Sequence, residues 1–213
     1  VAWLETGGIL CSVNIRGGNE FGAKWHEAGT LTKKQNVFDD FIAASEFLIA
    51  EKYTSKELLA INGASNGGLL VGACMTQRPD LYAVCLPQVG VLDMLRFEQS
   101  SVGTHWTADY GSVKTQEGFE NLLKYSPFHN IKSTTYPATL ILTGQQDDRV
   151  APWHSYKFAA TLQEKQEGNN PIHLCATPDA GHGTGKSLKK QVDEASMMLA
   201  FSLTNMGLDY SLQ

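Results

Sequence analysis

The sequence lacks the features that mark membrane, nucleic-acid-binding and zinc proteins. No apolar run approaches the length of a membrane span. Lys and Arg number 17 against 22 Asp and Glu, which gives a formal net charge of −5, and no basic run is interleaved with aromatic residues. We therefore expect neither a nucleic acid nor a membrane surface as a partner. Since no group of Cys and His residues has zinc-ligand spacing, no metal site is expected.

Cysteine is scarce, and none of it is arranged for redox or metal chemistry. The four cysteines are Cys11, Cys74, Cys85 and Cys175, and no two of them have C-x-x-C spacing. Free thiols in a reducing compartment are the simplest interpretation. The sequence also lacks repeats, low-complexity stretches and Pro/Ser-rich linkers, so its 213 residues are expected to form one domain, residues 1–213.

What the sequence does have is a regular alternation of strand-like and helix-like segments. Strands are expected at residues 9–15, 58–62, 83–89, 138–143 and 172–176, and helices at 38–49, 67–77, 154–164 and 188–203. Residues 94–128 are the least regular and are expected to form short helices and loops. This alternation predicts an α/β protein with a mostly parallel sheet and helices on both faces. In such sheets the chemistry lies at the carboxyl ends of the strands.

The helix patterns also predict ends and faces. Asn36 is expected to be the N-cap of the first long helix. The last helix is expected to bury a stripe of Leu188, Val192, Ala195, Leu199 and Leu203 and to stop near Gly207.

The loop after the second strand carries a nucleophile motif. Residues 63–68 read Gly-Ala-Ser-Asn-Gly-Gly and match G-x-S-x-G between a strand and a helix. Glycines on both sides of Ser65 permit a tight turn that exposes the hydroxyl at the top of the sheet. A serine needs a base, and the base needs an acid that fixes its tautomer.

Candidates for the base and the acid follow in the order that α/β-hydrolases use. Asp147 and Asp148 come after the strand at 138–143, and His182 comes after the last strand. All three positions are loops at the carboxyl ends of strands. The residues alone do not choose between Asp147 and Asp148.

Six motifs, in the same order along nearly the whole chain, resemble the prolyl oligopeptidase family. They are residues 14–18 (Asn-Ile-Arg-Gly-Gly), 63–68, 78–81 (Arg-Pro-Asp-Leu), 125–127 (Tyr-Ser-Pro), 147–150 (Asp-Asp-Arg-Val) and 180–183 (Ala-Gly-His-Gly). The resemblance implies an α/β-hydrolase fold and a cytoplasmic, cofactor-free serine endopeptidase that cleaves short peptides after proline. It also implies a β-propeller and the first strands of the hydrolase domain upstream of residue 1.

The resemblance assigns roles to residues. Ser65 resembles the nucleophile, His182 the general base and Asp147 the acid, and the backbone N–H of Asn66 is expected to be an oxyanion donor. Trp106 resembles the indole that stacks on the proline ring. Tyr110, Val91 and Val150 resemble other pocket walls, and Arg149 resembles the arginine that binds a substrate carbonyl.

Three alternatives stay open. A sister peptidase, such as oligopeptidase B, an acylaminoacyl peptidase or a dipeptidyl peptidase, would share Ser65 and differ in its pocket. A non-catalytic hydrolase-fold binding module would usually lack part of the triad. A simple esterase would not account for Trp106 and Arg149 together. The resemblance also places the family's second oxyanion donor, a tyrosine hydroxyl, upstream of this chain.

Overall fold

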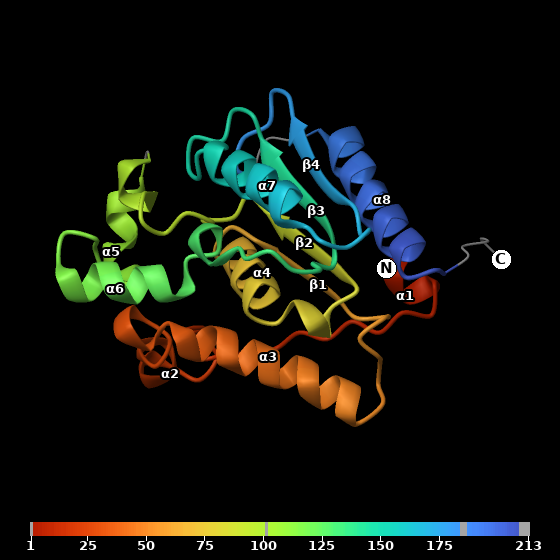
Figure 1. Cartoon of the computed structure of the whole chain (residues 1–213), viewed down its shortest axis with the longest axis horizontal. Helices are drawn as coiled ribbons and strands as arrows, with labels where there is room; N and C mark the ends of the chain where they lie inside the picture. Colours follow the sequence, from red (N-terminus) through yellow and green to blue (C-terminus); the bar gives the residue numbers. More distant parts are fainter. Residues whose placement is uncertain (1, 101, 184–186, 209–213) are drawn as a thin grey trace.

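Four parallel strands form the centre of the molecule. The computed structural model describes residues 2–100, 102–183 and 187–208. Within them, β1 (Ala60–Ala64), β2 (Val84–Gln88), β3 (Ala138–Gly144) and β4 (Ile172–Thr177) pair in the order β1-β2-β3-β4 (Figure 1). All seven residues of β3 are buried. These strands confirm four of the five expected from the sequence, with ends shifted by one or two residues.

Helices cover both faces of the sheet, as predicted. On one face lie α3 (Gln35–Ala50), α4 (Asn66–Gln77) and α7 (Trp153–Lys165), and on the other lie α8 (Leu188–Asn205) and the short α1 (Ala2–Glu5) (Figure 1). Alternate residues of one strand belong to different cores: Cys85 packs with the α3 and α4 side, whereas Val84 and Leu86 pack with the α8 side. The period of two along each strand therefore divides the apolar residues between two layers.

The remaining elements are short. They are α2 (Ala23–Glu27), α5 (Thr107–Tyr110), α6 (Gln116–Tyr125) and 3-10 turns at Leu31–Lys33, Pro79–Leu81, Phe97–Gln99, Gly103–Trp106 and Phe128–Asn130. Short helices and loops were the expectation for residues 94–128. No helix in the described part of the chain is both long enough and apolar enough to cross a membrane.

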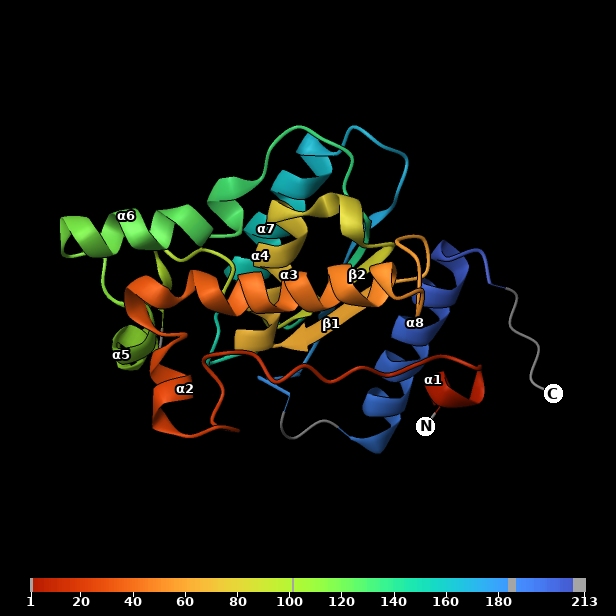
Figure 2. The same ribbon diagram turned by 90° about the horizontal axis from the view of Figure 1, so that it is seen from below.

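The strand predicted at residues 9–15 does not form. This segment runs as extended chain past α3 toward α2 (Figures 1 and 2), and Ile9 and Leu10 are 65% and 74% exposed. A strand exists through backbone pairing with a neighbour. None of the described strands lies beside this segment, so its β-forming sequence has no ladder to join.

The predicted N-cap of α3 is also wrong. The helix begins at Gln35, so Asn36 lies inside its first turn, where its Nδ2 donates to the carbonyl oxygen of Ala28 at 2.8 Å. The apolar periodicity begins at Phe38, which is completely buried. The periodicity therefore identified the part of α3 that faces the core and missed the first turn of the helix, which begins at Gln35.

The predicted stripe on α8 is rotated from the buried face. Leu188 and Val192 are 76% and 53% exposed, and Ala195 is exposed as well. The side chains that pack against the sheet are Met197, Met198 and Phe201, with Leu203 buried as predicted. The helix ends at Asn205, and Gly207 has φ +67°, so the predicted stop is confirmed.

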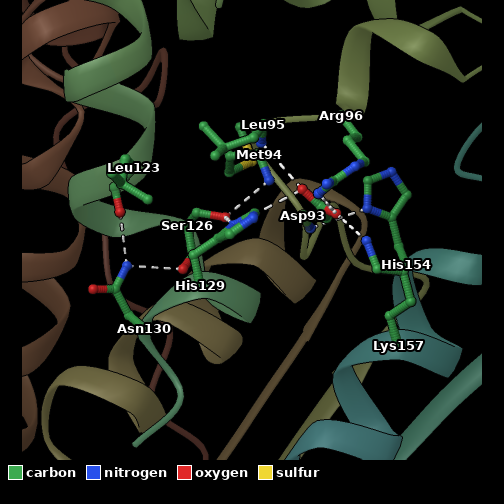
Figure 3. Close-up of polar contacts among 10 residues, drawn as sticks. All are labelled: Asp93, Met94, Leu95, Arg96, Leu123, Ser126, His129, Asn130, His154 and Lys157. Carbon is green, nitrogen blue, oxygen red and sulfur yellow. Dashed lines mark hydrogen bonds and ion pairs between the residues drawn. The ribbon is translucent and has the colours of Figure 1, made fainter.

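A buried carboxylate ties the loop after β2 to α7. The Asp93 side chain has no exposed surface and accepts hydrogen bonds from Lys157 and from Nη1 of Arg96 at 3.1 Å (Figure 3). Its backbone N–H donates to Nδ1 of His154 at 3.0 Å. Burial by itself raises the pKa of the Asp93 carboxyl, but Lys157, with His129 and Arg96, outweighs it, and the pKa lies below its usual value. Asp93 is therefore ionised at neutral pH.

The Asp93–Lys157 pair should contribute measurably to stability. We expect Lys157→Met to lower the free energy of unfolding by about 2 kcal/mol, because it leaves a buried carboxylate short of its cation. Lys165→Met on the same helix is the control, since Lys165 pairs at the surface with Glu164 at 3.3 Å and should contribute less than about 0.5 kcal/mol. Urea unfolding at pH 7 measures both.

The pH dependence has a definite sign. Because the folded pKa of Asp93 is depressed, its contribution is present above the ordinary Asp pKa and is lost as pH falls through the folded pKa. The difference between Lys157→Met and the wild-type protein should therefore shrink in acid. Equal destabilisation by the two lysine variants would contradict this account.

Candidate active site

The parallel sheet brings three loops to one edge. Ser65 follows β1, Asp147 follows β3 and His182 follows β4. Because all pairings between the strands are parallel, the carboxyl ends of these strands meet at the same edge. The three residues are 35 or more positions apart in sequence, and the sheet is what makes them neighbours.

Ser65 occupies a strained turn between β1 and α4. Its φ of 60° and ψ of −115° are unfavourable for a side chain with Cβ, and its N–H donates to the carbonyl of Gln88 at 2.9 Å. A Cβ on Gly63 would lie 2.3 Å from the oxygen of Gly67, and one on Gly68 would lie 2.5 Å from that of Gln88. A Cβ on Gly67 would meet no described residue within 4 Å, so the close approach depends on Gly63 and Gly68, not on the second glycine of the motif.

Ser65, His182 and Asp147 form a continuous hydrogen-bonded line. Nε2 of His182 lies 2.8 Å from Oγ of Ser65, and Nδ1 lies 2.8 Å from Oδ2 of Asp147. An ionised carboxylate only accepts, so Nδ1 carries a proton and Nε2 is left to accept from the serine hydroxyl. The other carboxylate oxygen of Asp147 accepts from the backbone N–H groups of Arg149 and Val150 at 3.0 and 2.8 Å. These hydrogen bonds hold Asp147, His182 and the Ser65 hydroxyl in one orientation.

The structure separates the two aspartates that the sequence left equivalent. Asp147 is 5% exposed and contacts His182, whereas Asp148 is exposed. The side chain of Arg149 is exposed on the same loop.

The loops that carry Asp147 and His182 cross at a glycine. The last residue of β3 is Gly144, where an added Cβ would lie 2.2 Å from the carbonyl oxygen of Ala180 and 2.6 Å from that of Gly181. The N–H of Gln146 donates to the same Ala180 oxygen at 2.9 Å. This backbone contact holds the loops of Asp147 and His182 close together.

Asn66 follows the serine and is held by two donors. It is the first residue of α4, so its backbone N–H lies at a helix N-terminus beside Ser65. Its side-chain Oδ1 accepts from the hydroxyl of Tyr110 at 2.9 Å and from Nζ of Lys34 at 3.4 Å. The sequence patterns did not identify Lys34 as a site residue. The fold brings it next to Asn66.

Three aromatic rings pack together beside this residue. Trp106 is half-buried and stacks on Phe97, with 6.5 Å between ring centroids and 15° between planes. Tyr110 contacts both rings edge-on, at 5.5 Å from Phe97 and 6.5 Å from Trp106. Phe97 is completely buried and was missed by sequence reasoning, because the segment around it has no regular period. It is the support on which the Trp106 indole rests.

Val91 and Val150 are each 2% exposed and belong to the same core cluster as Tyr110. Of the residues predicted for a pocket, these two are core members and Trp106 keeps an accessible surface. An open hollow of about 420 Å³ lies elsewhere, between β4 and α8 at the amino end of the strand. Its lining residues are Pro171, His173, Met197, Ala200, Phe201, Thr204 and Asn205.

A second serine, histidine and aspartate come together near α6 and do not form a relay. Oγ of Ser126 and a carboxylate oxygen of Asp93 both lie near Nδ1 of His129, at 2.8 and 3.9 Å (Figure 3). A relay needs the serine and the acid on opposite imidazole nitrogens. Ser126 is also completely buried and accepts from the N–H of Met94 at 3.0 Å. This cluster is structural.

The crossing at Gly144 yields a test of the site geometry. Gly144→Ala should push apart the loops of Asp147 and His182 and slow covalent labelling of Ser65 by a fluorophosphonate by about 10²-fold, since a displacement of 1 Å is sufficient for such a loss. Gly181→Ala is the matched control, because the nearest atom to its Cβ, among described residues other than its chain neighbours, would be the oxygen of Gln146 at 3.8 Å. Equal labelling rates for the two variants would show that the crossing does not set the geometry.

The chain was compared with known families and curated proteins. The Prolyl oligopeptidase family matches residues 1–209. The prolyl endopeptidase of Elizabethkingia meningoseptica is 53% identical over 208 residues, which cover 97% of this chain and 30% of that protein. That of Dictyostelium discoideum is 48% identical over 198 residues, covering 91% and 26%. The chain therefore spans about 30% of the length of the curated relatives it matches.

Solved structures agree with the sequence comparison. A structure from a study of two prolyl endopeptidases superposes with a TM-score of 0.96 at 42% identity, covering 98% of this chain and 31% of that one. Prolyl oligopeptidase B from Galerina marginata, bound to a 35mer substrate, gives 0.88 at 40% identity, covering 92% and 28%. The fold is thus the α/β-hydrolase fold that the sequence predicted. Taken with the match over residues 1–209, these likenesses show that the chain belongs to the prolyl oligopeptidase family.

Proposed function

We propose that the protein is a serine endopeptidase that cleaves short peptides on the carboxyl side of proline. The observation that carries the proposal is the hydrogen-bonded line from Ser65 through His182 to Asp147. Family membership and relatives named prolyl endopeptidase support the choice of substrate. In this proposal Ser65 is the nucleophile, His182 the general base and Asp147 the acid that orients it.

The first step is acylation. Oγ of Ser65 attacks the carbonyl carbon of the substrate proline while Nε2 of His182 takes the hydroxyl proton. The carbonyl electron pair moves to oxygen, and the backbone N–H of Asn66 stabilises the negative charge. As the intermediate collapses, the C–N bond breaks and His182 returns its proton to the leaving amine.

The second step is hydrolysis of the acyl-enzyme. Water gives its proton to Nε2 of His182 and its oxygen to the carbonyl carbon, and the ester bond to Ser65 breaks. The proton returns to Oγ, so the triad is regenerated without a cofactor. Asp147 accepts the hydrogen bond from Nδ1–H throughout and stabilises the imidazolium that forms in each step.

We propose Trp106 as the surface on which the proline ring packs. Phe97 supports its indole from below, and Tyr110 closes one side. A flat ring against an indole gains on the order of 1 kcal/mol beyond the area it buries. Val91 and Val150, each 2% exposed, would be buried walls behind this surface, and the exposed Arg149 would bind the carbonyl next to the cleavage site.

We propose further that residues 1–213 are the peptidase part of a longer enzyme with a β-propeller upstream. The coverage of the relatives, about 30% of their length, supports this. In that arrangement a tyrosine hydroxyl from the upstream part would be the second oxyanion donor. Since losing one such donor typically costs about 10²- to 10³-fold in rate, the isolated chain would be weakly active or inactive.

We place the enzyme in the cytoplasm. All four cysteines lie in the described part of the chain and are free; Cys74 and Cys85 are buried, and burial raises the pKa of both thiols. Unpaired cysteines fit a reducing compartment.

A sister peptidase of other specificity is the second candidate. It would keep Ser65, His182 and Asp147 and differ in the pocket. The stacked pair of Trp106 and Phe97 favours a flat apolar side chain over a basic one, which would need acidic partners. A non-catalytic module is disfavoured by the complete hydrogen-bonded line, and a simple esterase by Trp106 together with Arg149.

Hydrolysis of an N-terminally blocked Gly-Pro reporter tests the proposal. We expect the full-length protein to release the reporter and Ser65→Ala to reduce the rate at least about 10⁴-fold, because the residual rate then comes only from binding and the oxyanion donors. The isolated chain is assayed in parallel and should turn over slowly or not at all. Rapid turnover by the isolated chain would contradict the need for an upstream donor, and equal rates with and without Ser65 would contradict the mechanism.

Trp106→Ala tests the pocket. The ratio of kcat/KM for the proline reporter to that for the matching Gly-Ala reporter should fall about tenfold, which is the rate equivalent of a stacking contact of about 1.4 kcal/mol. The ratio is informative because a general loss of stability lowers both values equally. An unchanged ratio would remove Trp106 from the specificity site.

A further inference from the structure

A buried lysine next to the nucleophile turn has no carboxylate partner. Lys34 directly precedes α3 and is only 4% exposed. Every ion pair found in the described part of the chain leaves Lys34 out. The charge of Asp109 acts on it, but the carboxylate of Asp109 pairs with His26 at 3.3 Å. Burial lowers the pKa of Lys34 to about 8, and Asp109 offsets this only in part.

Such a residue weakens the folded state. A buried cation without an ion pair loses its hydration and gains little in return, and replacing it by an apolar side chain of similar length is often neutral or stabilising. Residues that are retained at a cost in stability tend to serve function. The position of Lys34 shows which function that is.

The ammonium of Lys34 lies near Asn66, the proposed oxyanion residue, and near Tyr110, which contacts Asn66 as well. Its Nζ lies 3.4 Å from Oδ1 of Asn66 and 5.2 Å from the ring centroid of Tyr110, whose hydroxyl donates to the same Oδ1 at 2.9 Å. An ammonium group can only donate, so the atom of the Asn66 amide that faces it must be the oxygen. Lys34 and Tyr110 therefore fix the orientation of the Asn66 side chain from two different elements.

Lys34 also places a positive charge beside Asn66, the residue that follows Ser65 in the sequence. Asn66 is the first residue of α4, and its backbone N–H is the donor expected to meet the oxyanion. Lys34 is itself 4% exposed, and a buried cation stabilises a nearby developing negative charge more strongly than a cation at the surface does. The same ammonium thus constrains the residue that carries the donor and adds to the field of that donor.

We propose that Lys34 is a positioning residue for catalysis, which holds Asn66 against Tyr110 and supplies positive charge behind the oxyanion site. This inference rests on the proposed serine peptidase function. In the acylation step the bond from Ser65 Oγ to the carbonyl carbon forms, the hydroxyl proton goes to His182, and the carbonyl electron pair moves to oxygen. Lys34 acts on that oxygen through the geometry of Asn66 and through its charge, and it exchanges no proton with the substrate.

The test compares two adjacent lysines in the full-length protein. Lys34→Met removes the charge and the donor but keeps an apolar chain of similar length, and Lys33→Met is the matched control because Lys33 is exposed. With the Gly-Pro reporter, Lys34→Met should lower kcat about tenfold or more, leave KM within about twofold, and give a melting temperature no lower than that of the wild type. A residue with a merely structural role would lower the melting temperature and leave kcat of the folded fraction unchanged.

A double-mutant cycle tests the route through Asn66. Asn66→Ala keeps the backbone N–H and removes Oδ1, so Lys34→Met should cost clearly less in that background if Lys34 acts through the side chain. Full additivity would overturn the route through Asn66. A kcat for Lys34→Met within twofold of the wild type, or an equal loss in Lys33→Met, would overturn the proposal as a whole.

Two further outcomes would also decide between a catalytic and a structural role for Lys34. If Lys34→Met does not fold, Lys34→Gln takes its place under the same thresholds, and failure of both variants to fold would make Lys34 structural and overturn the proposal. If the wild-type protein does not cleave the proline reporter, the proposed function fails separately. The rate of fluorophosphonate labelling of Ser65 in the wild type and in Lys34→Met then tests Lys34 by the same tenfold criterion.

Discussion

The structure depends on one strained turn, in which Ser65 is forced to φ 60° between a strand and a helix. The backbone can close that tightly because Gly63 has no Cβ to meet the Gly67 carbonyl and Gly68 none to meet that of Gln88. The hydrogen bond from the Ser65 N–H to Gln88 fastens the turn to β2. The partners of the Ser65 hydroxyl must therefore be brought to this turn, because its backbone is fixed by the two close approaches and by the hydrogen bond to Gln88.

Two buried charges near the site have opposite energetic characters. Asp93 is surrounded by Lys157, Arg96 and His129, so its burial is compensated and it ties the loop after β2 to α7. Lys34 has no ion pair in the described part of the chain, and its ammonium lies near the Asn66 amide and the face of Tyr110. A fold selected for stability alone would have no use for the second arrangement. The contrast explains why Asp93 is interpreted as structural and Lys34 as functional.

Sequence patterns predicted the strands of the regular core correctly. They failed where neighbouring elements decide whether a strand forms or which face of a helix is buried. The two central strands, β2 and β3, are almost wholly buried and were found because continuous apolar runs have no other place to go. The segment at residues 9–15 has equal β-forming character but no neighbouring strand, so it stays extended and exposed. On α8, regular aliphatic spacing pointed to Leu188 and Val192, whereas the sheet receives Met197, Met198 and Phe201, because the rotation of a helix is set by the surface it meets.

The sequence by itself determined the fold class, the turn at Ser65 and the order of serine, aspartate and histidine, since these depend on local sterics, on periodicity and on the position of loops after strands. The residues alone left Asp147 and Asp148 equivalent, and the family resemblance favoured Asp147. The tertiary structure supplied the physical reason, because it buries Asp147 against His182 and leaves Asp148 exposed. It alone placed Phe97 beneath Trp106 and Lys34 beside Asn66. Those contacts join segments more than 30 residues apart or lie in irregular chain, where no local period encodes which side chains will meet.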